Sequence, residues 1–336
     1  MDVLIIGGTR FVGYQLAWRL LARGDRLTLL NRGTRPDPFG DRVERIAVDR
    51  STPGFAAALA GRRFDAAVDF AAYNADDARG AVEILGEGRV GHHVHISTGQ
   101  VYLVRRGCPK PAREVDYEGT LMDRPIDPAD LEDWDYGIGK RAAEDVLADA
   151  WRAGQFPSAR LRIPMVNGER DHYRRVESYL YRILDGGPVI LPDGGTRPTR
   201  HVYGGAVVDA IAELLGKPAT FGKAYNLAQE ETPTLAEIVA ILARIVGSPD
   251  RSVAVGSGAI RAAGLDPAAI SPFSGRWMSF LDPALARDEL GFRHEPVRSY
   301  LEKVVAVFLN APPAAPPGNY ANRATEIRLA ARPSGH

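Results

Sequence analysis

Short apolar runs alternate with amphipathic helical patterns along the first half of the chain. The runs typical of buried strands are residues 3–6, 26–30, 45–48, 66–70, 93–97 and 159–163, with one more at 224–227. Helical periodicity, with apolar side chains three and four positions apart, marks residues 14–23, 55–60, 75–85 and 136–151. Strands that alternate with helices predict a parallel sheet covered on both faces. The expected fold class is therefore α/β, with a doubly wound parallel sheet and a smaller, mixed C-terminal domain.

The regular alternation ends after Gly168, where turns rich in glycine and proline follow. Residues 235–246 form the next helical pattern, with Thr234 as the expected N-cap and Glu237 as its capping-box partner. A last amphipathic helix is expected at 300–309, before a proline-rich stretch. The predicted parts are a dinucleotide-binding domain of 1–166 plus about 202–230, a substrate-binding domain of 167–201 plus about 231–310, and a proline-rich linker and tail, 311–336.

The charges of the chain cancel: 42 Lys and Arg residues balance 42 Asp and Glu residues. Without an overall positive field, neither nucleic acid nor an anionic membrane is an expected partner. A single cysteine, Cys108, excludes an intrachain disulfide and fits a reducing compartment. No apolar stretch approaches the roughly 18 residues of a membrane span, and the first residues lack a signal-peptide pattern. These features predict a cytoplasmic protein that takes a small-molecule substrate.

The first strand runs into a glycine-rich turn, and a helix begins at once. Gly7 permits the tight turn, and Gly13 permits close packing of the helix on the strand. The backbone between them lies at a helix N-terminus, whose positive dipole end favours a pyrophosphate. The turn therefore predicts a dinucleotide-binding domain of the Rossmann type. Its expected cofactor-binding residues are Gly7, Thr9, Arg10, Phe11, Val12 and Gly13.

Asn31 and Arg32 end the second strand, about 20 residues after the glycines. An acidic residue here would bind the ribose 2′-hydroxyl of NAD, but Asn31 is neutral and Arg32 is basic. With Arg10 nearby, this position suits a 2′-phosphate. NADP is therefore the expected cofactor, and NAD is the alternative.

Tyr136 and Lys140 stand four residues apart on an expected helix and therefore share one face. The Lys140 ammonium favours the tyrosinate form of Tyr136, which can exchange a proton with a substrate hydroxyl or carbonyl. Thr98 directly follows the expected fifth strand, and the family resemblance described below implies that its hydroxyl holds the reacting oxygen. The expected catalytic set is therefore Thr98, Tyr136 and Lys140.

Segments within residues 1–310 resemble the extended short-chain dehydrogenase/reductase family, in its NAD-dependent epimerase/dehydratase branch. They include the turn at 7–13, the segment 95–102, the Tyr-x-x-x-Lys motif and the crossover at 161–168. The resemblance implies that Lys140 bonds the nicotinamide ribose and that Asp49 contacts the adenine amino group. The residues that it implies to line the dinucleotide are Ala71, Ala72 and Pro164. Homodimers are usual in such families, so a homodimer is expected.

Some positions depart from the family pattern, among them Arg10, Tyr203 and Gly204. Members that dehydrate nucleotide sugars carry Asp-Glu right after the threonine, as acid and base for water loss, whereas this chain has Gly99 and Gln100. Neither side chain ionises, so a 4,6-dehydratase is not expected. Asp69 stands where the family often has His, and a structural hydrogen bond is expected of it.

Several side chains downstream suit an anionic substrate, such as the diphosphate of a nucleotide sugar, because arginine binds phosphate in a bidentate way. The candidate substrate-binding residues are Gln100, Asn167, Arg170, Arg197, Arg200 and Arg276. No metal site is expected, because His92, His93 and His95 have no acidic or cysteine partner spaced with them.

The expected function is that of an NAD(P)-dependent oxidoreductase or epimerase, with hydride transfer and Tyr136 as acid/base. Its expected substrate is a nucleotide sugar or a related hydroxyl or ketone compound. One alternative is a non-catalytic nucleotide- or RNA-binding member of the same fold, because a related branch includes chloroplast proteins that bind stem-loop RNA. Another is a dinucleotide-sensing regulator. The sequence leaves reduction and epimerisation both open.

Overall fold

The computed structural model describes residues 1–154 and 156–331. It divides into two compact units. The first consists of Met1–Pro164, Gly204–Ala228 and Ser279–His294, and the second of Met165–Tyr203, Gln229–Met278 and the chain from Glu295 onward. Among the described residues, no helix is long and apolar enough to cross a membrane.

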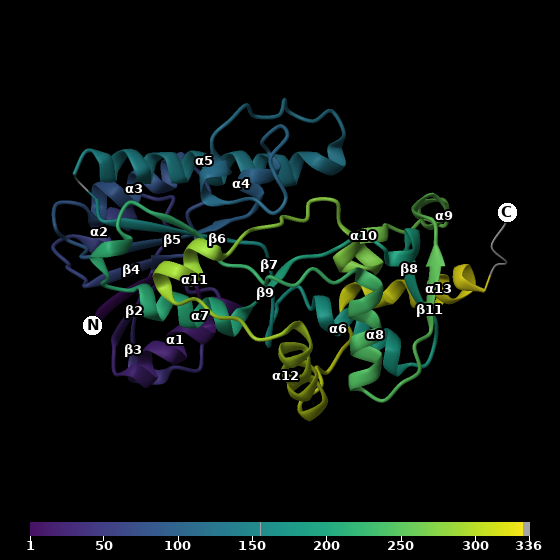
Figure 1. Ribbon diagram of the computed structural model, residues 1–336. Coiled ribbons are helices and arrows are strands. Elements are labelled where there is room, and N and C mark those ends of the chain that lie inside the picture. The colour runs from purple at the N-terminus through teal and green to yellow at the C-terminus, as the bar shows by residue number, and fades with distance from the viewer. Residues whose placement is uncertain (155, 332–336) are drawn as a thin grey trace. The chain divides into compact units, whose positions relative to one another are not determined.

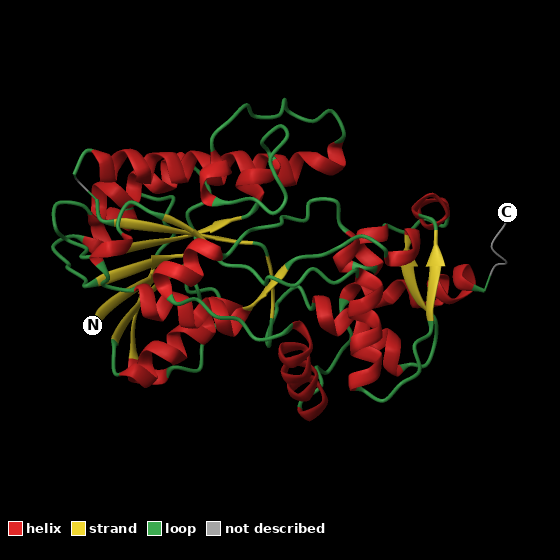
Figure 2. Ribbon diagram, viewed as in Figure 1, coloured by secondary structure: helices red, strands yellow, loops and turns green. Residues whose placement is uncertain are grey.

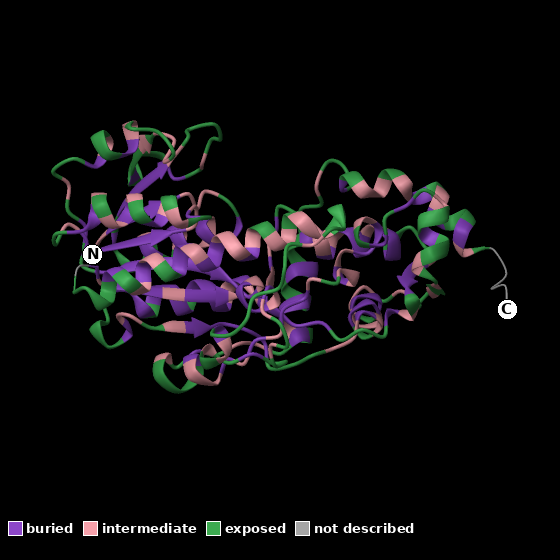
Figure 3. Cartoon of the chain, turned by 90° about the horizontal axis from the view of Figure 1, so that it is seen from above, coloured by how far each residue is buried: buried purple, intermediate pink, exposed green. Residues whose placement is uncertain are grey.

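A seven-stranded parallel sheet forms the centre of the first unit, in the order β10-β6-β5-β4-β1-β2-β3 (Figures 1 and 2). The strands are β1 (Asp2–Ile6), β2 (Arg26–Asn31), β3 (Val43–Ala47), β4 (Ala66–Asp69), β5 (His93–Thr98), β6 (Ser158–Ile163) and β10 (Ala224–Asn226). Strands β4 and β5 are buried at every residue and β1 at every residue after Asp2, and Figure 3 shows the strands of this sheet as mostly buried. Burial on both faces explains the apolar runs of β1 and β4. This sheet confirms the predicted α/β fold of the Rossmann type.

Helices cover both faces of this sheet. The helices of the first unit are α1 (Phe11–Arg23), α2 (Gly54–Leu59), α3 (Ala75–Leu85), α4 (Gln100–Leu103), α5 (Pro128–Arg152), α7 (Gly204–Leu214) and α11 (Ala284–Leu290). In Figure 1, α3 and α5 pack together on one face, and α1 and α7 pack together on the other. One hydrophobic core joins the apolar sides of α2, α3 and α5 to the sheet.

The order in which the chain adds strands changes side between β1 and β4, which are paired, parallel neighbours: β2 and β3 follow on one side of β1, and β4, β5 and β6 on the other. In a doubly wound sheet, this change of side opens a crevice at the carboxyl ends of the strands, and ligands bind there. The register brings these ends to one edge: Ile6 pairs with both Leu30 and Asp69, and Thr98 pairs with Ile163.

The second unit is smaller and mixed. It contains two pairs of parallel strands, β7 (Met165–Asn167) with β9 (His201–Tyr203) and β8 (Val189–Pro192) with β11 (Ser252–Val255). Its helices are α6 (Arg175–Leu184), α8 (Leu235–Ile245), α9 (Ser257–Ala262), α10 (Pro267–Ile270), α12 (Val297–Asn310) and α13 (Arg323–Ala330). The apolar faces of α6, α8 and α12 share one core. The predicted capping box of α8 is confirmed, since Thr234 and Glu237 exchange both hydrogen bonds.

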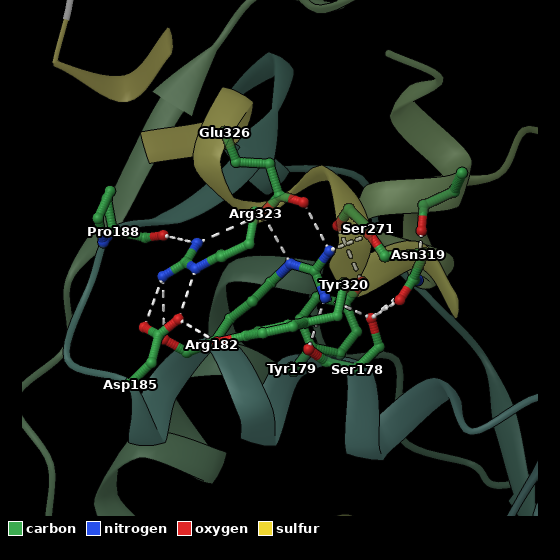
Figure 4. Close-up of polar contacts among 11 residues, drawn as sticks. Ser178, Tyr179, Arg182, Asp185, Pro188, Ser271, Asn319, Tyr320, Arg323 and Glu326 are labelled. Atoms are coloured by element: carbon green, nitrogen blue, oxygen red, sulfur yellow. Dashed lines mark hydrogen bonds and ion pairs between the residues drawn. The ribbon is translucent and has the colours of Figure 1, made fainter. Parts of the chain in front are cut away.

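The C-terminal segment packs on α6 through buried polar contacts (Figure 4). Glu326 on α13 accepts hydrogen bonds of 2.6 and 2.8 Å from the guanidinium of Arg182, and both side chains are about 1% exposed. Arg323 bonds Asp185 at the end of α6. The predicted tail therefore contains a docked helix up to Ala330, and the rest of it, 332–336, lies outside the described residues.

Candidate active site

The turn between β1 and α1 is built from glycines that no other residue can replace without strain. Gly7 and Gly8 adopt φ angles of 78° and 71°, in the left-handed region. A Cβ on Gly8 would stand 2.7 Å from the Ile5 side chain, and a Cβ on Gly13 would overlap the backbone of Gly8. The turn therefore lets a ligand reach the backbone and lets α1 start directly against the strand.

The N-terminus of α1 lacks the capping that a helix ordinarily receives. Its N-cap residue, Arg10, makes no side-chain capping bond, and the first turn contains no acidic residue. The first amides of a helix need acceptors, and the dipole adds positive potential. The N-terminus of a helix is a site that favours a pyrophosphate, and the residues expected to bind one here are Thr9, Arg10, Phe11 and Val12.

The candidate adenosine residues lie at the ends of β2 and β3. The Asn31 side chain accepts a hydrogen bond of 2.7 Å from the Gly33 amide, while Arg32 is exposed. Asp49 accepts bonds from both the amide and the hydroxyl of Ser51, and these bonds together with the Arg32 charge lower its pKa. Arg32 is thus a cation at the expected ribose position, and Asp49 is an anion near it.

Ala71 and Ala72 follow β4, and a buried ion pair fixes the start of this loop. Asp69 is fully buried and accepts two hydrogen bonds of 2.8 Å from Arg50. The Asp69 carboxylate also accepts a hydrogen bond of 2.8 Å from the backbone amide of Ala71. A Cβ on Gly7 would stand 3.2 Å from Ala71 Cβ, so the small side chain of Ala71 permits the close approach of the two loops. The structural role expected of Asp69 is present, but its partner Arg50 had no signal in the sequence.

Thr98 lies at the end of β5, and its hydroxyl oxygen accepts the Gln100 amide at 3.2 Å. This leaves the hydroxyl proton for donation to a ligand. The Gln100 side-chain amide donates to Asp133 on α5. At Gly99, a Cβ would overlap the side chain of Ser279. The position after the threonine therefore has no room for a side chain.

Two glycines draw α5 against the carboxyl ends of the strands. A Cβ on Gly137 would stand 2.6 Å from Val104, and a Cβ on Gly139 would stand 2.6 Å from the carbonyl oxygen of Tyr73. Tyr136 and Lys140 flank these glycines on successive turns of α5. The Tyr-Gly-Ile-Gly-Lys sequence thus combines two polar groups with the two positions that let them approach the sheet.

Lys140 is buried at the edge of the sheet, about 2% exposed. Its ammonium donates to the carbonyl oxygens of Ala72, at 2.7 Å, and Ile96, at 2.8 Å. Burial lowers the pKa of Lys140 to about 8, although the charges of Asp69 and Glu144 oppose the shift. The Lys140 ammonium therefore lies at the carboxyl ends of β4 and β5. Its acceptor on β5, Ile96, is two residues before Thr98 in the chain.

Tyr136 is partly exposed, and its ring lies 6.3 Å from that of Tyr73. Tyr73 also lies beneath Lys140, whose Nζ is 4.9 Å from the ring centroid. Sequence reasoning missed Tyr73, because a tyrosine after two alanines carries no motif. Lys140 thus bonds the strand that ends at Thr98, and Tyr136 precedes Lys140 by one turn of α5.

A buried network lies behind Thr98 and anchors α5. Glu144 accepts a hydrogen bond of 2.5 Å from the Ser97 hydroxyl and one of 2.6 Å from the guanidinium of Arg162 on β6. Arg162 also donates to the Tyr102 hydroxyl at 2.6 Å. The Arg162 charge and its hydrogen bonds hold the pKa of Glu144 below its usual value despite burial. This network is an ionised pair that fixes the distance between α5 and the sheet.

The candidate substrate residues of the second unit differ in their surroundings. Asn167 is fully buried, and its amide donates to His201, at 2.9 Å, and Tyr300. Arg200 is mostly buried and donates to the Glu230 carbonyl at 2.9 Å. The exposed members of the set are Arg170, Arg197 and Arg276. Asn167 and Arg200 therefore bond protein groups in the interior, and the other three arginines lie at the surface.

Pro164 directly follows β6 and is the last residue of the first of the three segments that make up the first unit.

The three histidines around β5 are buried, and burial lowers the pKa of His92 to about 4 and that of His95 well below its usual value. Within residues 1–154 and 156–331, no group of three His, Cys, Asp or Glu side chains is arranged to hold a metal ion.

Comparison with known proteins links this site to a family. Residues 3–228 match the sequence model of the NAD dependent epimerase/dehydratase family. A 2′-dehydrokanamycin reductase from Streptomyces kanamyceticus is 24% identical over 260 residues, which span 76% of this chain and 69% of that protein. A chloroplast stem-loop binding protein of 41 kDa from Arabidopsis thaliana is 21% identical over 265 residues, 75% of this chain and 65% of its own.

Solved structures share the fold. A UDP-glucose 4-epimerase from Thermotoga maritima, with UDP-glucose, has a TM-score of 0.73 at 18% identity, covering 92% of this chain and 99% of its own. A dTDP-glucose 4,6-dehydratase from Streptomyces venezuelae, with NAD bound, has a TM-score of 0.70 at 20% identity, covering 93% and 98%.

Proposed function

Because this chain belongs to the NAD dependent epimerase/dehydratase family, we propose that it is an NAD(P)-dependent oxidoreductase or epimerase that uses Tyr136 as its acid/base. Its substrate is a nucleotide sugar or a related hydroxyl or ketone compound. The observation that carries this proposal is that Lys140, one helical turn after Tyr136, donates to the backbone carbonyls of Ala72 after β4 and of Ile96 on β5, the strand that ends at Thr98.

The chemistry follows from the groups at this edge. When bound, a nicotinamide supplies the hydride donor or acceptor. The Tyr136 phenol gives a proton to the substrate oxygen as a carbonyl is reduced, or removes it as a hydroxyl is oxidised. Thr98 donates its hydroxyl proton to the same oxygen and holds it in place. Lys140 has two of its three donors on backbone carbonyls, so the third suits a ribose hydroxyl, and its charge favours the tyrosinate.

Water loss is not part of the proposed reaction. A dehydratase needs an ionisable acid and base next to the threonine. At these positions Gly99 has no room for a side chain, and Gln100 has a neutral amide that bonds Asp133. Reduction, oxidation or epimerisation remain.

The proposed cofactor is NADP, with NAD as the alternative. Arg32 and Arg10 are exposed cations beside the expected ribose site and suit a 2′-phosphate. Solved proteins of the same fold include one with NAD and UDP-glucuronic acid. We also propose that the protein is a cytoplasmic homodimer and that the exposed arginines of the second unit bind an anionic part of the substrate.

The 2′-dehydrokanamycin reductase suggests a sugar-derived ketone as one substrate type to include. The chloroplast relative favours a second candidate function, binding of structured RNA without catalysis. The zero net charge opposes it, because non-specific RNA binding draws on a basic surface.

Mass spectrometry of the protein as purified tests the proposal first. A tightly held NAD or NADP would support it and, if NAD is retained through turnover, would favour epimerisation. The second step is a panel of nucleotide sugars and sugar ketones followed by nicotinamide absorbance. If no dinucleotide binds and a stem-loop RNA binds with a strong salt dependence, the RNA-binding function replaces the enzymatic one.

A further inference from the structure

Tyr73 is the first residue after the alanine pair that follows β4, and its side chain is about half exposed. Large aromatic side chains are ordinarily covered, since each buries considerable apolar area. Its ring nevertheless has two neighbours in the candidate site: the Lys140 ammonium, 4.9 Å from the ring centroid, and the Tyr136 ring, 6.3 Å away. Tyr73 thus contacts both members of the Tyr-x-x-x-Lys pair.

The backbone of Tyr73 is held from two sides. Its amide donates to the Asp77 carboxylate at 2.8 Å, and Asp77 in turn lies 3.4 Å from the Arg50 guanidinium. On the other side, the Tyr73 carbonyl oxygen lies where a Cβ on Gly139 would need to be. The backbone that carries the ring is therefore held both by the start of α3 and by the close approach of α5.

The Lys140 ammonium needs such a neighbour. It is buried and donates only two of its three hydrogens to the carbonyls of Ala72 and Ile96. A cation over an aromatic face is stabilised relative to its neutral form, and the effect grows as water is removed. The Tyr73 ring therefore opposes the tendency of burial to discharge Lys140.

Other charges around Lys140 act in both directions. Those that face it are Asp69 from β4, Glu144 from α5 and Asp77 from α3, which favour the ammonium, and Arg50 after β3, which opposes it. His95 on β5 also faces Lys140, but its lowered pKa leaves it neutral. Among these neighbours, the Tyr73 ring contributes without carrying a charge of its own. Its replacement therefore tests one interaction without altering the charge balance.

We propose that Tyr73 is a positioning residue whose ring keeps Lys140 charged and in place next to Tyr136. The proposal rests on the proposed function, because the charge on Lys140 matters for catalysis through Tyr136. It assigns to Tyr73 a role that depends on its aromatic face and not on its hydroxyl.

The test compares Tyr73→Leu with Tyr73→Phe. Leucine keeps an apolar side chain but removes the π face, whereas phenylalanine keeps the face and removes the hydroxyl. The chain has five lysines, Lys110, Lys140, Lys217, Lys223 and Lys303, and all but Lys140 are exposed. Lysine labelled with carbon-13 at Cε therefore gives few NMR signals, and a Lys140→Met variant identifies the one from Lys140.

The pKa of Lys140 is then titrated in the protein without added ligand. We expect Tyr73→Leu to lower it by about half a unit, the size of one partly desolvated cation–π contact, and Tyr73→Phe to leave it where it is. The other four lysines serve as internal controls. In turnover assays, the alkaline limb of the rate profile moves to lower pH by the same amount in the leucine variant alone.

Equal pKa values for Lys140 in the wild type and the leucine variant would overturn the inference. So would equal shifts in both variants, because the hydroxyl would then be the active group. The titration needs no turnover, so its failure is distinguishable from failure of the proposed function, which appears as an absence of dinucleotide-dependent activity. Thermal melting of both variants checks that the fold is retained.

Discussion

Glu144→Gln tests the network that holds α5 against the sheet, because it removes a buried charge and keeps the size of the side chain. Glutamine can still accept the hydrogen bond from Ser97 through its carbonyl oxygen. It cannot neutralise Arg162, whose guanidinium contacts both Glu144 oxygens at 2.6 to 3.0 Å. Both partners are almost fully buried, with side chains 4% and 1% exposed.

Breaking a buried pair on one side costs about 3–5 kcal/mol, mostly through the charge that remains. The retained Ser97 bond and the Tyr102 hydroxyl near Arg162 favour the lower end, about 3 kcal/mol. For a unit of this size, that corresponds to a fall in Tm of about 6–12 °C. Because the pKa of Glu144 is lowered in the folded state, its contribution is present at neutral pH and is lost as the pH falls. The difference between wild type and variant therefore shrinks on acidification.

Calorimetry of the wild type, Glu144→Gln and Glu132→Gln measures this. Glu132 lies on the same helix but is exposed, so its replacement should change the unfolding free energy by less than about 0.5 kcal/mol. An Arg162→Met, Glu144→Leu double variant should regain part of the loss, since neither charge remains buried. Equal Tm values for Glu144→Gln and Glu132→Gln would refute the assignment of an ionised pair.

Three further changes have defined outcomes. Arg32→Ala should weaken NADPH binding more than NADH binding in calorimetric titrations, and equal losses would mean that Arg32 does not contact a 2′-phosphate. Gly139→Ala should lower kcat about 100-fold, because the added Cβ would push α5 away from the Tyr73 carbonyl oxygen. Gly80→Ala is the control, since a Cβ there meets open space and should leave kcat unchanged. A wild-type kcat for both variants would contradict the close approach of α5. Glu326→Gln should lower Tm by several degrees because it leaves Arg182 buried with less compensation, and the exposed Glu302→Gln is its control. Indistinguishable melting of the Glu326 and Glu302 variants would show that the ion pair does not anchor the C-terminal segment.

The strands of the first unit follow closely from the sequence, because burial on both faces of a parallel sheet imposes apolar runs. Its helices follow in part: α1, α2 and α3 lie where they were expected, α5 begins at Pro128 and not at Tyr136, and α4, α7 and α11 were not predicted. The glycine-rich turn is equally predictable from the sequence, since Gly7 and Gly13 occupy positions where a side chain would clash. The Tyr-x-x-x-Lys pair could be found because both residues lie on one helix. Each of these signals is local in the chain.

Contacts between segments that lie far apart in the chain have no local sequence pattern from which they could be predicted. The sequence predicts a second domain that includes about 231–310, yet Ser279–His294 belongs to the first unit. The Asp282 amide donates to Ala112, and α11 packs near β10, which explains the difference. The Arg182–Glu326 pair joins residues far apart in sequence, and neither had a recognisable motif.

The candidate site shows the same limit. Asn167 fits a polar position near a substrate by its place in the motif, but its amide also bonds His201 and Tyr300 within the second unit. Arg50 and Tyr73 were not foreseen, because their roles depend on Asp69 and Lys140 being brought next to them by the sheet.

Proton exchange by the phenol on α5 is tested most directly by Tyr136→Phe, measured for cofactor binding and turnover in the same preparation. Calorimetry should give a dinucleotide Kd within about threefold of the wild type, while kcat falls at least about 100-fold through loss of the acid/base group. Turnover at the wild-type rate with unchanged cofactor binding would contradict the account.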